Sequence, residues 1–169
     1  MQISTIISTL EKLERLHKSL YEIAVSKTEY IKSNDIEKLD QIIKNEQAHV
    51  TGIETLESMR LQQVKAYMEL QNETVQDNHY AIADLLKTLN QESSEYQALY
   101  NIREQLMEVL AKLKDVNDLN QKLLFQSLQF VNISLNMLRP QSQEQVNYSD
   151  KEVMGKQTMN KKSYFDSQA

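Results

Sequence analysis

The chain has 169 residues, with 24 Asp and Glu against 19 Lys and Arg, so its formal net charge is −5. It contains 2 Gly, 1 Pro and no Cys, whereas average usage predicts roughly 12 Gly and 8 Pro in this length. So few turn-forming residues exclude most β-sandwiches, barrels and α/β enzymes, and the lack of Cys excludes disulfides and thiolate metal sites. The acidic balance argues against nucleic acid as a partner.

Hydrophobic residues still reach 40%, at a mean hydropathy of −0.57. Long amphipathic helices with narrow apolar faces have this composition. We therefore expect an all-α protein, an antiparallel helical hairpin or bundle of long amphipathic helices with a disordered C-terminal tail.

The first predicted helix covers residues 3–32. Its apolar residues recur every three or four positions, with interruptions at His17 and Lys27. They are Ile3, Ile6, Leu10, Leu13, Leu20, Ala24 and Ile31. Residues 33–35 end the helix, and Asn34 followed by Glu37 has the spacing of a capping box that starts the next helix.

The second predicted helix covers residues 36–68, and the short connection before it predicts an antiparallel hairpin. Its apolar face comprises Ile36, Leu39, Ile43, Val50, Ile53, Leu56, Leu61, Val64 and Met68. Glu46 and Arg60 interrupt this face in phase. Each either pairs with another helix and fixes the register, or extends to solvent at the edge of the face.

A short helix and a final long helix complete the predicted helical domain. The short helix places Val75, His79, Ile82, Leu86 and Leu89 on one face, and Ser94 with Gln97 repeats the capping spacing. The last helix covers residues 95–138 and stops before Pro140. Its apolar face comprises Leu99, Ile102, Leu106, Val109, Leu113, Val116 and Leu123.

The predicted helical domain is residues 1–139, and residues 140–169 form a flexible polar tail. The tail is rich in Gln, Ser, Asn and Lys, so it buries too little apolar surface to offset its ordering entropy. Residues 1–5 lack the basic start and the small-residue cleavage site of a signal peptide. We expect a cytoplasmic protein with no integral membrane segment.

Catalytic and cofactor motifs are absent from the sequence. None of His17, His49 and His79 has a carboxylate at the i+3 or i+4 position of a helical metal motif. Gly52 and Gly155 are isolated, so there is no glycine-rich phosphate loop. We expect a protein that is not an enzyme and that uses no cofactor, no metal and no catalytic residue.

Residues 123–138 carry no charge, although 25% of the chain is charged. At about 100° per residue, the apolar positions near this end form two stripes. The first is Leu124, Leu128, Val131, Leu135 and Leu138. The second is Leu119, Leu123, Phe130, Ile133 and Met137. A helix in a small bundle needs one such stripe, so the second is surplus.

Several explanations compete for the surplus apolar surface. Gln126, Gln129, Asn132 and Asn136 make the segment too polar to span a membrane, and Lys122 alone is too little positive charge for a membrane-surface helix. The protein's own hairpin could bury it, or a helical segment of another protein could bind there. A structural coiled-coil or adaptor protein could use it for a homodimer or a permanent complex.

The sequence resembles the FlgN-type flagellar export chaperones over nearly its whole length. The early matches are Leu20-Tyr21-Glu22-Ile23-Ala24, Lys27, Tyr30-Ile31 and Asp35. The middle matches are Leu39, Glu46-Gln47, Ile53, Leu56-Glu57 and Arg60. The late matches are Leu119-Asn120-Gln121, Leu123-Leu124, Gln126-Ser127-Leu128 and Leu138-Arg139-Pro140.

The resemblance implies a cytoplasmic chaperone of flagellar type III secretion. Its clients would be the hook–filament junction (hook-associated) proteins, which it keeps from assembling prematurely and delivers to the export gate at the membrane. The C-terminal helical part would bind the client, here through the two stripes between Leu119 and Leu138. The family's export-gate contact is a tyrosine just past the proline, which corresponds to Tyr148.

Overall fold

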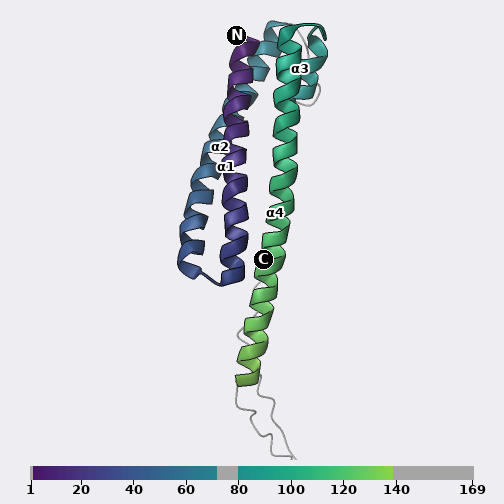
Figure 1. Ribbon diagram of the computed structural model, residues 1–169. Helices are drawn as coiled ribbons and strands as arrows, with labels where there is room; N and C mark the ends of the chain where they lie inside the picture. The colour runs from purple at the N-terminus through teal and green to yellow at the C-terminus, as the bar shows by residue number, and fades with distance from the viewer. Residues whose placement is uncertain (1, 72–79, 139–169) are drawn as a thin grey trace, which may run out of the picture.

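The computed structural model describes residues 2–71 and 80–138, which form four α-helices and no strand within these ranges (Figure 1). The helices are α1 (Ile3–Ser33), α2 (Ile36–Leu70), α3 (Ile82–Thr88) and α4 (Ser94–Leu138). The predicted all-α architecture of long helices is confirmed. The predicted polar tail, residues 140–169, lies outside the described residues, as do Val75 and His79 of the predicted short helix.

Two residues connect α1 to α2, and the second of them, not the first as predicted, caps α2. Asn34 ends α1 in the left-handed conformation at φ 54°, which asparagine tolerates better than most residues. Asp35 is the N-cap of α2, and its carboxylate accepts a hydrogen bond from the Lys38 backbone N–H at 3.2 Å. The predicted capping box of Asn34 and Glu37 is therefore wrong. The Lys38 side chain and then its backbone N–H hold the pKa of Asp35 below its usual range.

The cap of α4 also lies one residue before the predicted position. The Ser93 hydroxyl accepts from the Tyr96 backbone N–H at 3.1 Å, and Ser94 is the first helical residue. In α3, Leu85 rather than Leu86 is fully buried. Both corrections have the same cause. Two adjacent residues of the same type suit the position equally well, and only the folded backbone shows which of them occupies it.

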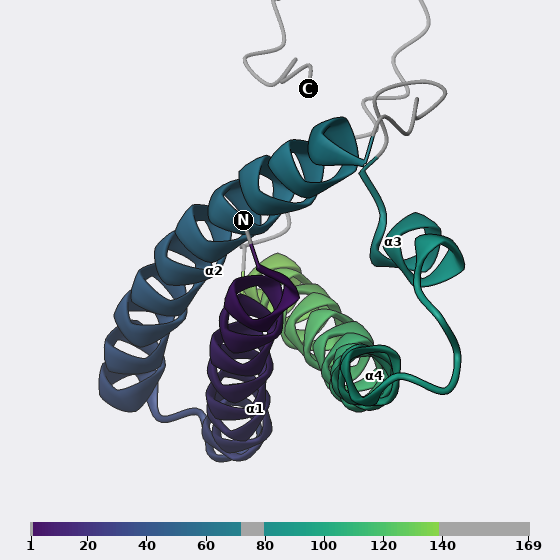
Figure 2. The same cartoon turned by 90° about the horizontal axis from the view of Figure 1, so that it is seen from above.

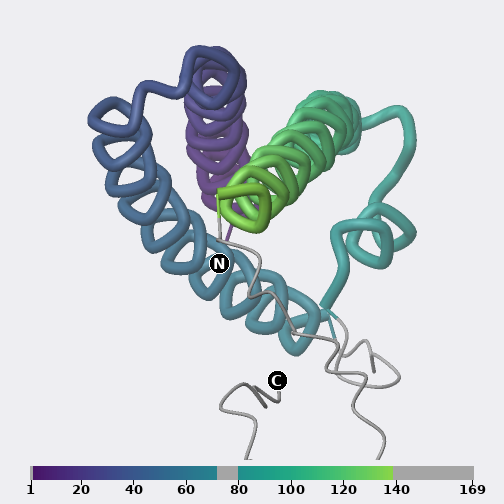
Figure 3. The backbone as a smooth tube through the Cα atoms, turned by 90° about the horizontal axis from the view of Figure 1, so that it is seen from below, coloured from purple at the N-terminus to yellow at the C-terminus, as the bar shows by residue number. Residues whose placement is uncertain are grey.

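α1 is the central helix of the bundle, and α2 and α4 pack on it along most of its length (Figures 2 and 3). α2 runs antiparallel to α1, as the short connection predicted, so that Ser19 Oγ bonds to His49 Nε2 at 2.8 Å. α4 runs parallel to α1, and Thr28 of α1 bonds to Asn120 of α4. No Cα atoms of α2 and α4 lie within 8 Å of each other.

The hydrophobic core is thicker at the end that holds α3. There, side chains from all four helices form one cluster of Ile6, Leu10, Leu13, Val64, Met68, Leu85, Leu99 and Ile102. Toward the α1–α2 turn the core narrows to Leu20, Ala24 and Leu113, with Tyr21, Ile53 and Val116 packed beside them. The bundle is thus held mainly from its upper end, as drawn in Figure 1.

The predicted apolar face of α2 is only partly buried. Val64 and Met68 are buried as predicted, and Ile42, which the sequence did not single out, is buried as well. Ile36, Ile43, Val50 and Leu61 are exposed. α2 therefore presents a second, uncovered apolar line beside the face that it packs on α1.

Leu13→Ala should lower the free energy of unfolding by about 2–5 kcal/mol, because it removes a fully buried side chain from the main cluster. Val25→Ala on the same helix is the control, since Val25 is exposed and its truncation should change stability by less than about 0.5 kcal/mol. Urea denaturation followed by circular dichroism measures both. Equal losses in the two variants would contradict this placement of the core.

Candidate functional site

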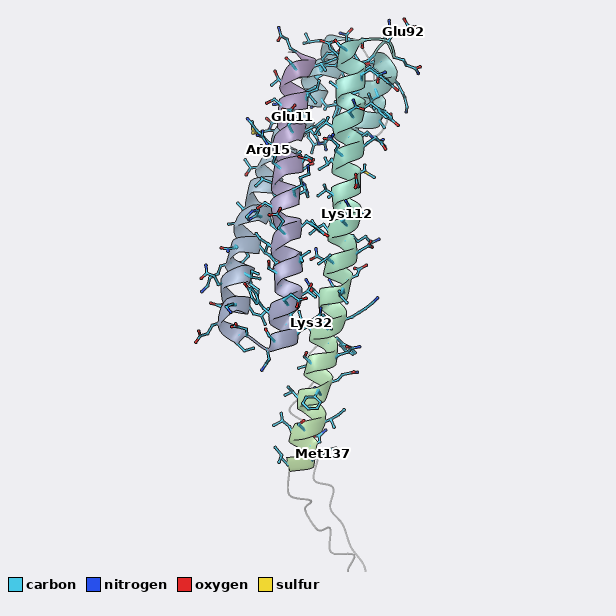
Figure 4. All side chains as sticks on the ribbon, in the orientation of Figure 1. Glu11, Arg15, Lys32, Glu92, Lys112 and Met137 are labelled. Carbon is cyan, nitrogen blue, oxygen red and sulfur yellow. The ribbon has the colours of Figure 1, made fainter. Side chains whose placement is uncertain are left out.

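The end of α4 extends beyond the helical hairpin. Asn120 lies beside Thr28, five residues before α1 ends at Ser33, whereas α4 continues for 18 residues to Leu138. Because the helices are parallel, about 13 residues of α4, or about 20 Å, lie past the end of α1. Figure 4 shows Met137 far below Lys32, which marks the last turn of α1. We call the uncharged residues 123–138, most of which lie past the end of α1, the projecting segment.

A buried polar contact joins α4 to α1 immediately before this segment. Asn120 is 3% exposed and is the last buried residue of α4. The Thr28 hydroxyl donates to Asn120 Oδ1 at 2.6 Å, and the Asn120 side-chain amide donates to the Ala24 carbonyl at 2.9 Å. A buried asparagine in an apolar helix interface favours the one register that satisfies its hydrogen bonds. This contact therefore determines how much of α4 projects.

Nearly all the residues of the two predicted stripes are exposed to solvent. Leu123 is half-buried, and the others range from 44% exposed at Leu119 and Leu124 to 81% at Met137. The exposed members are Leu119, Leu124, Leu128, Phe130, Val131, Ile133, Leu135, Met137 and Leu138. They all lie on the C-terminal part of α4, away from the main hydrophobic cluster.

Burial by the protein's own hairpin is the one explanation of the surplus surface that this geometry contradicts. The hairpin ends about 13 residues before α4 does, and the described residues leave every stripe residue exposed except the half-buried Leu123. Neither stripe is a core face of the bundle, and Leu124, Leu128 and Val131 of the first stripe are exposed. Parallel packing of α4 on α1, which the sequence did not reveal, is the reason.

Phe125 belongs to the same surface but lies outside both predicted stripes. It is 61% exposed and sits about 100° around the helix from Leu124. Helical spacing alone could not find it. The signal that could is the run without charge, which includes Phe125 and indicates that most of the helix circumference is apolar there.

The hydroxyls of two serines on the projecting segment form hydrogen bonds within the helix. Ser127 donates to the Leu123 carbonyl and Ser134 to the Phe130 carbonyl, both at 2.9 Å. Such bonds to the preceding helical turn leave little of the hydroxyl's hydrogen-bonding capacity to be lost on burial. A partner that covers this surface therefore desolvates few unsatisfied polar groups.

The polar interruptions of α2 are partnered rather than solvated. Lys27 Nζ of α1 lies 2.6 Å from Glu46 Oε2, and these side chains are 18% and 17% exposed. Arg60 donates to Glu57 Oε2 at 2.7 Å and to the Tyr80 carbonyl at 3.1 Å. Pairing with another helix is therefore confirmed for Glu46, whereas Arg60 pairs within α2 and with the loop before α3.

The histidines that the structure describes have structural partners. His17 is buried and its Nδ1–H donates to the Leu13 carbonyl at 2.8 Å, while His49 bonds to Ser19. In the described part of the chain, no group of three or more His, Cys, Asp or Glu side chains could hold a metal ion. Over residues 2–71 and 80–138, no helix combines the length and hydropathy that crossing a bilayer requires. Tyr148 lies outside the described residues.

Asn120→Ala should lower the free energy of unfolding by about 1–3 kcal/mol, because two buried hydrogen bonds between α1 and α4 are lost. Asn132→Ala on the exposed projecting segment is the matched control and should change stability by less than about 0.5 kcal/mol. Urea denaturation measures both variants. An Asn120 variant as stable as the wild type would show that this contact does not hold α4 in place.

Comparison with known proteins identifies the family. The chain is 32% identical, over all 169 residues and the full length of both proteins, to a Bacillus subtilis (strain 168) protein named "Uncharacterized protein YvyG". No solved structure matches significantly. The sequence model of the family described as "FlgN protein" matches residues 1–155, which include all four helices and the projecting segment. The chain belongs to the FlgN family, a family of flagellar export chaperones.

Proposed function

We propose that this protein is a cytoplasmic chaperone of flagellar type III secretion. It binds hook–filament junction proteins on the projecting segment, keeps them unassembled and delivers them to the export gate. The observation that carries the proposal is a long, uncharged apolar helix end that its own hairpin leaves exposed. Monomeric soluble proteins rarely expose such contiguous apolar surface unless it binds a partner.

Binding alone, without chemistry, accounts for this activity. A client segment that binds the chaperone is stabilised in its unassembled form by RT ln(1 + [chaperone]/Kd), which is about 2.7 kcal/mol at a hundredfold excess over Kd. Covering the client's apolar assembly surface also suppresses premature aggregation. The contacts would be apolar and amide contacts, so release at the export gate breaks no buried ion pair.

A homodimer through the same surface is the second candidate, as a structural coiled-coil or adaptor protein. The observation that favours it is the line on which α4 packs against α1, which continues past Asn120 through Leu124 and Val131. A second copy could bind where α1 ends. Sedimentation distinguishes the two candidates, because a monomer at all concentrations excludes the homodimer.

Charging either stripe should abolish client capture without unfolding the protein. The two double variants are Leu128→Glu with Leu135→Glu, and Phe130→Glu with Met137→Glu. Because all four residues are exposed, the helical circular dichroism and the melting temperature should stay close to wild type. Affinity for a purified hook–filament junction protein, measured by calorimetry, should fall at least tenfold, since one buried anchor is worth about 2 kcal/mol or more.

The control for these variants is Asn101→Glu with Gln105→Glu, which adds the same charge at exposed positions of α4 far from the projecting segment. It should retain most of the affinity. Equal losses in the control would assign the effect to charge rather than to apolar contact. Cooperative unfolding of both stripe variants would mean that the stripes are core, and the proposed surface would be wrong.

Tyr148→Ala should separate delivery from capture. We propose Tyr148 as the export-gate contact because of its position after Pro140. The variant should bind the junction protein with unchanged affinity, while secretion of that protein into the medium falls in a strain that carries it. Tyr164→Ala, another tyrosine past the proline, is the control. Normal secretion by the Tyr148 strain would refute the gate contact and leave the client surface unaffected.

A further inference from the structure

An apolar line on α2 is left without a covering element among the described residues. Ile36, Ile43 and Val50 are spaced seven residues apart and are 63%, 44% and 45% exposed. Ile42, one position away from this line, is buried toward α1. Apolar residues at heptad spacing form the face that one helix offers to a second helix. α2 thus has one such face for α1 and a second that is unoccupied.

Val50 of this line borders a groove of about 280 Å³ at the lower half of the bundle. Leu20 and Lys27 of α1 form its floor, Val50 lies on the α2 side, and Gln121 and Leu124 lie on the α4 side. α2 and α4 both pack on α1 but have no Cα atoms within 8 Å of each other. Viewed along the bundle, the two helices diverge on either side of α1 (Figures 2 and 3).

At the upper end of the bundle, α3 occupies the position between α2 and α4. It packs on both helices, and its fully buried Leu85 joins Val64 and Leu99 in the main cluster. α3 ends after seven residues. The bundle therefore has four helices at one end, whereas over the groove the described residues supply three. The geometry of the occupied end indicates that a helix fits the remaining position.

The charge around the groove indicates which kind of helix fits. Lys27 and Glu46 pair with each other at 2.6 Å, so the two charged groups that line the groove neutralise one another. The α4 side contributes the amides of Asn117 and Gln121. Leu124 belongs both to the groove and to the first stripe of the uncharged projecting segment. A single partner helix with one uncharged face can therefore contact both the groove and the first stripe.

We propose that the groove between α2 and α4 binds an amphipathic helix of the client, as the fourth helix of the lower bundle. This inference rests on the proposed function, because the same client helix continues along the projecting segment. Ile36 to Val50 spans about 21 Å and the projection adds about 20 Å, so a helix of about 27 residues contacts both. The client helix then contacts both the groove and the projecting segment, rather than the end of α4 alone.

Site-specific spin labels test this proposal, because the chain has no Cys and a single one can be introduced at will. The labelled variants are Val50→Cys in the groove, Leu128→Cys on the projecting segment and Thr55→Cys, which is exposed elsewhere on α2. The probe is a purified hook–filament junction protein. We expect it to immobilise the labels at positions 50 and 128 and to leave the label at 55 unchanged.

The other outcomes separate this inference from the proposed function. Immobilisation at 128 alone would overturn the groove and leave the proposed function intact, whereas immobilisation at neither would refute both. A label at 50 that is already immobile without client would also overturn the proposal. If that immobility grows with protein concentration, a second copy occupies the groove. If it disappears when the chain is truncated after Leu138, the chain's own C-terminal residues occupy it.

Substitution gives a second, independent measurement. Val50→Lys should weaken binding of the junction protein at least tenfold, because Glu46 is already paired with Lys27 and the added ammonium is one charge in excess in the interface. Thr55→Lys carries the same charge on the same helix and should change the affinity less than twofold. Both positions are exposed in the free protein, so their melting temperatures should match wild type. Equal affinities of the two variants would overturn the proposal.

Discussion

The structure depends on the contact between Asn120 of α4 and the Ala24–Thr28 turn of α1. α4 has 45 residues and α1 has 31, so the longer helix must project at one end or both. Ile7 and Ala98 border one cavity near the start of the two helices, and Asn120 satisfies its amide only beside Thr28. Together these contacts make the C-terminal end project. A shift of α4 by one heptad would leave a buried amide without partners, which costs about 1–3 kcal/mol.

An exposed apolar helix end is an aggregation hazard, and its composition limits that hazard. The stripes are separated on one side by the amides of Gln129, Asn132 and Asn136, which water solvates, and the serine hydroxyls are satisfied within the helix. The surface thus has no charge that must be desolvated when a partner binds. Such a surface accepts different apolar side chains with similar free energies, which is useful for holding an unassembled segment and releasing it intact.

The sequence predicted where the helices lie better than which helices pack against each other. Apolar spacing and Pro140 located α1, α2 and the end of α4 within one or two residues, and the absence of charge identified the projecting segment. The two caps were misplaced because Asn34 and Asp35, or Ser93 and Ser94, are both chemically suited to a cap. Ile43 and Val50 were assigned to the hairpin interface because heptad spacing defines a face but not the helix that covers it. The parallel register of α4 depends on tertiary contacts that no local pattern encodes.

Charged side chains make contacts within the hairpin, whereas the projecting segment has no charged side chain. Ion pairs and hydrogen bonds between segments, such as Lys27 with Glu46 and Arg60 with the Tyr80 carbonyl, lie within the hairpin and its contacts with the loop before α3. These directional contacts fix one arrangement of α1 and α2. From Leu123 to Leu138 the side chains are neutral, so in the proposed function only shape and apolar area select a partner. In the proposed function, this hairpin, whose arrangement is fixed by polar contacts, positions an adaptable apolar surface for a client segment.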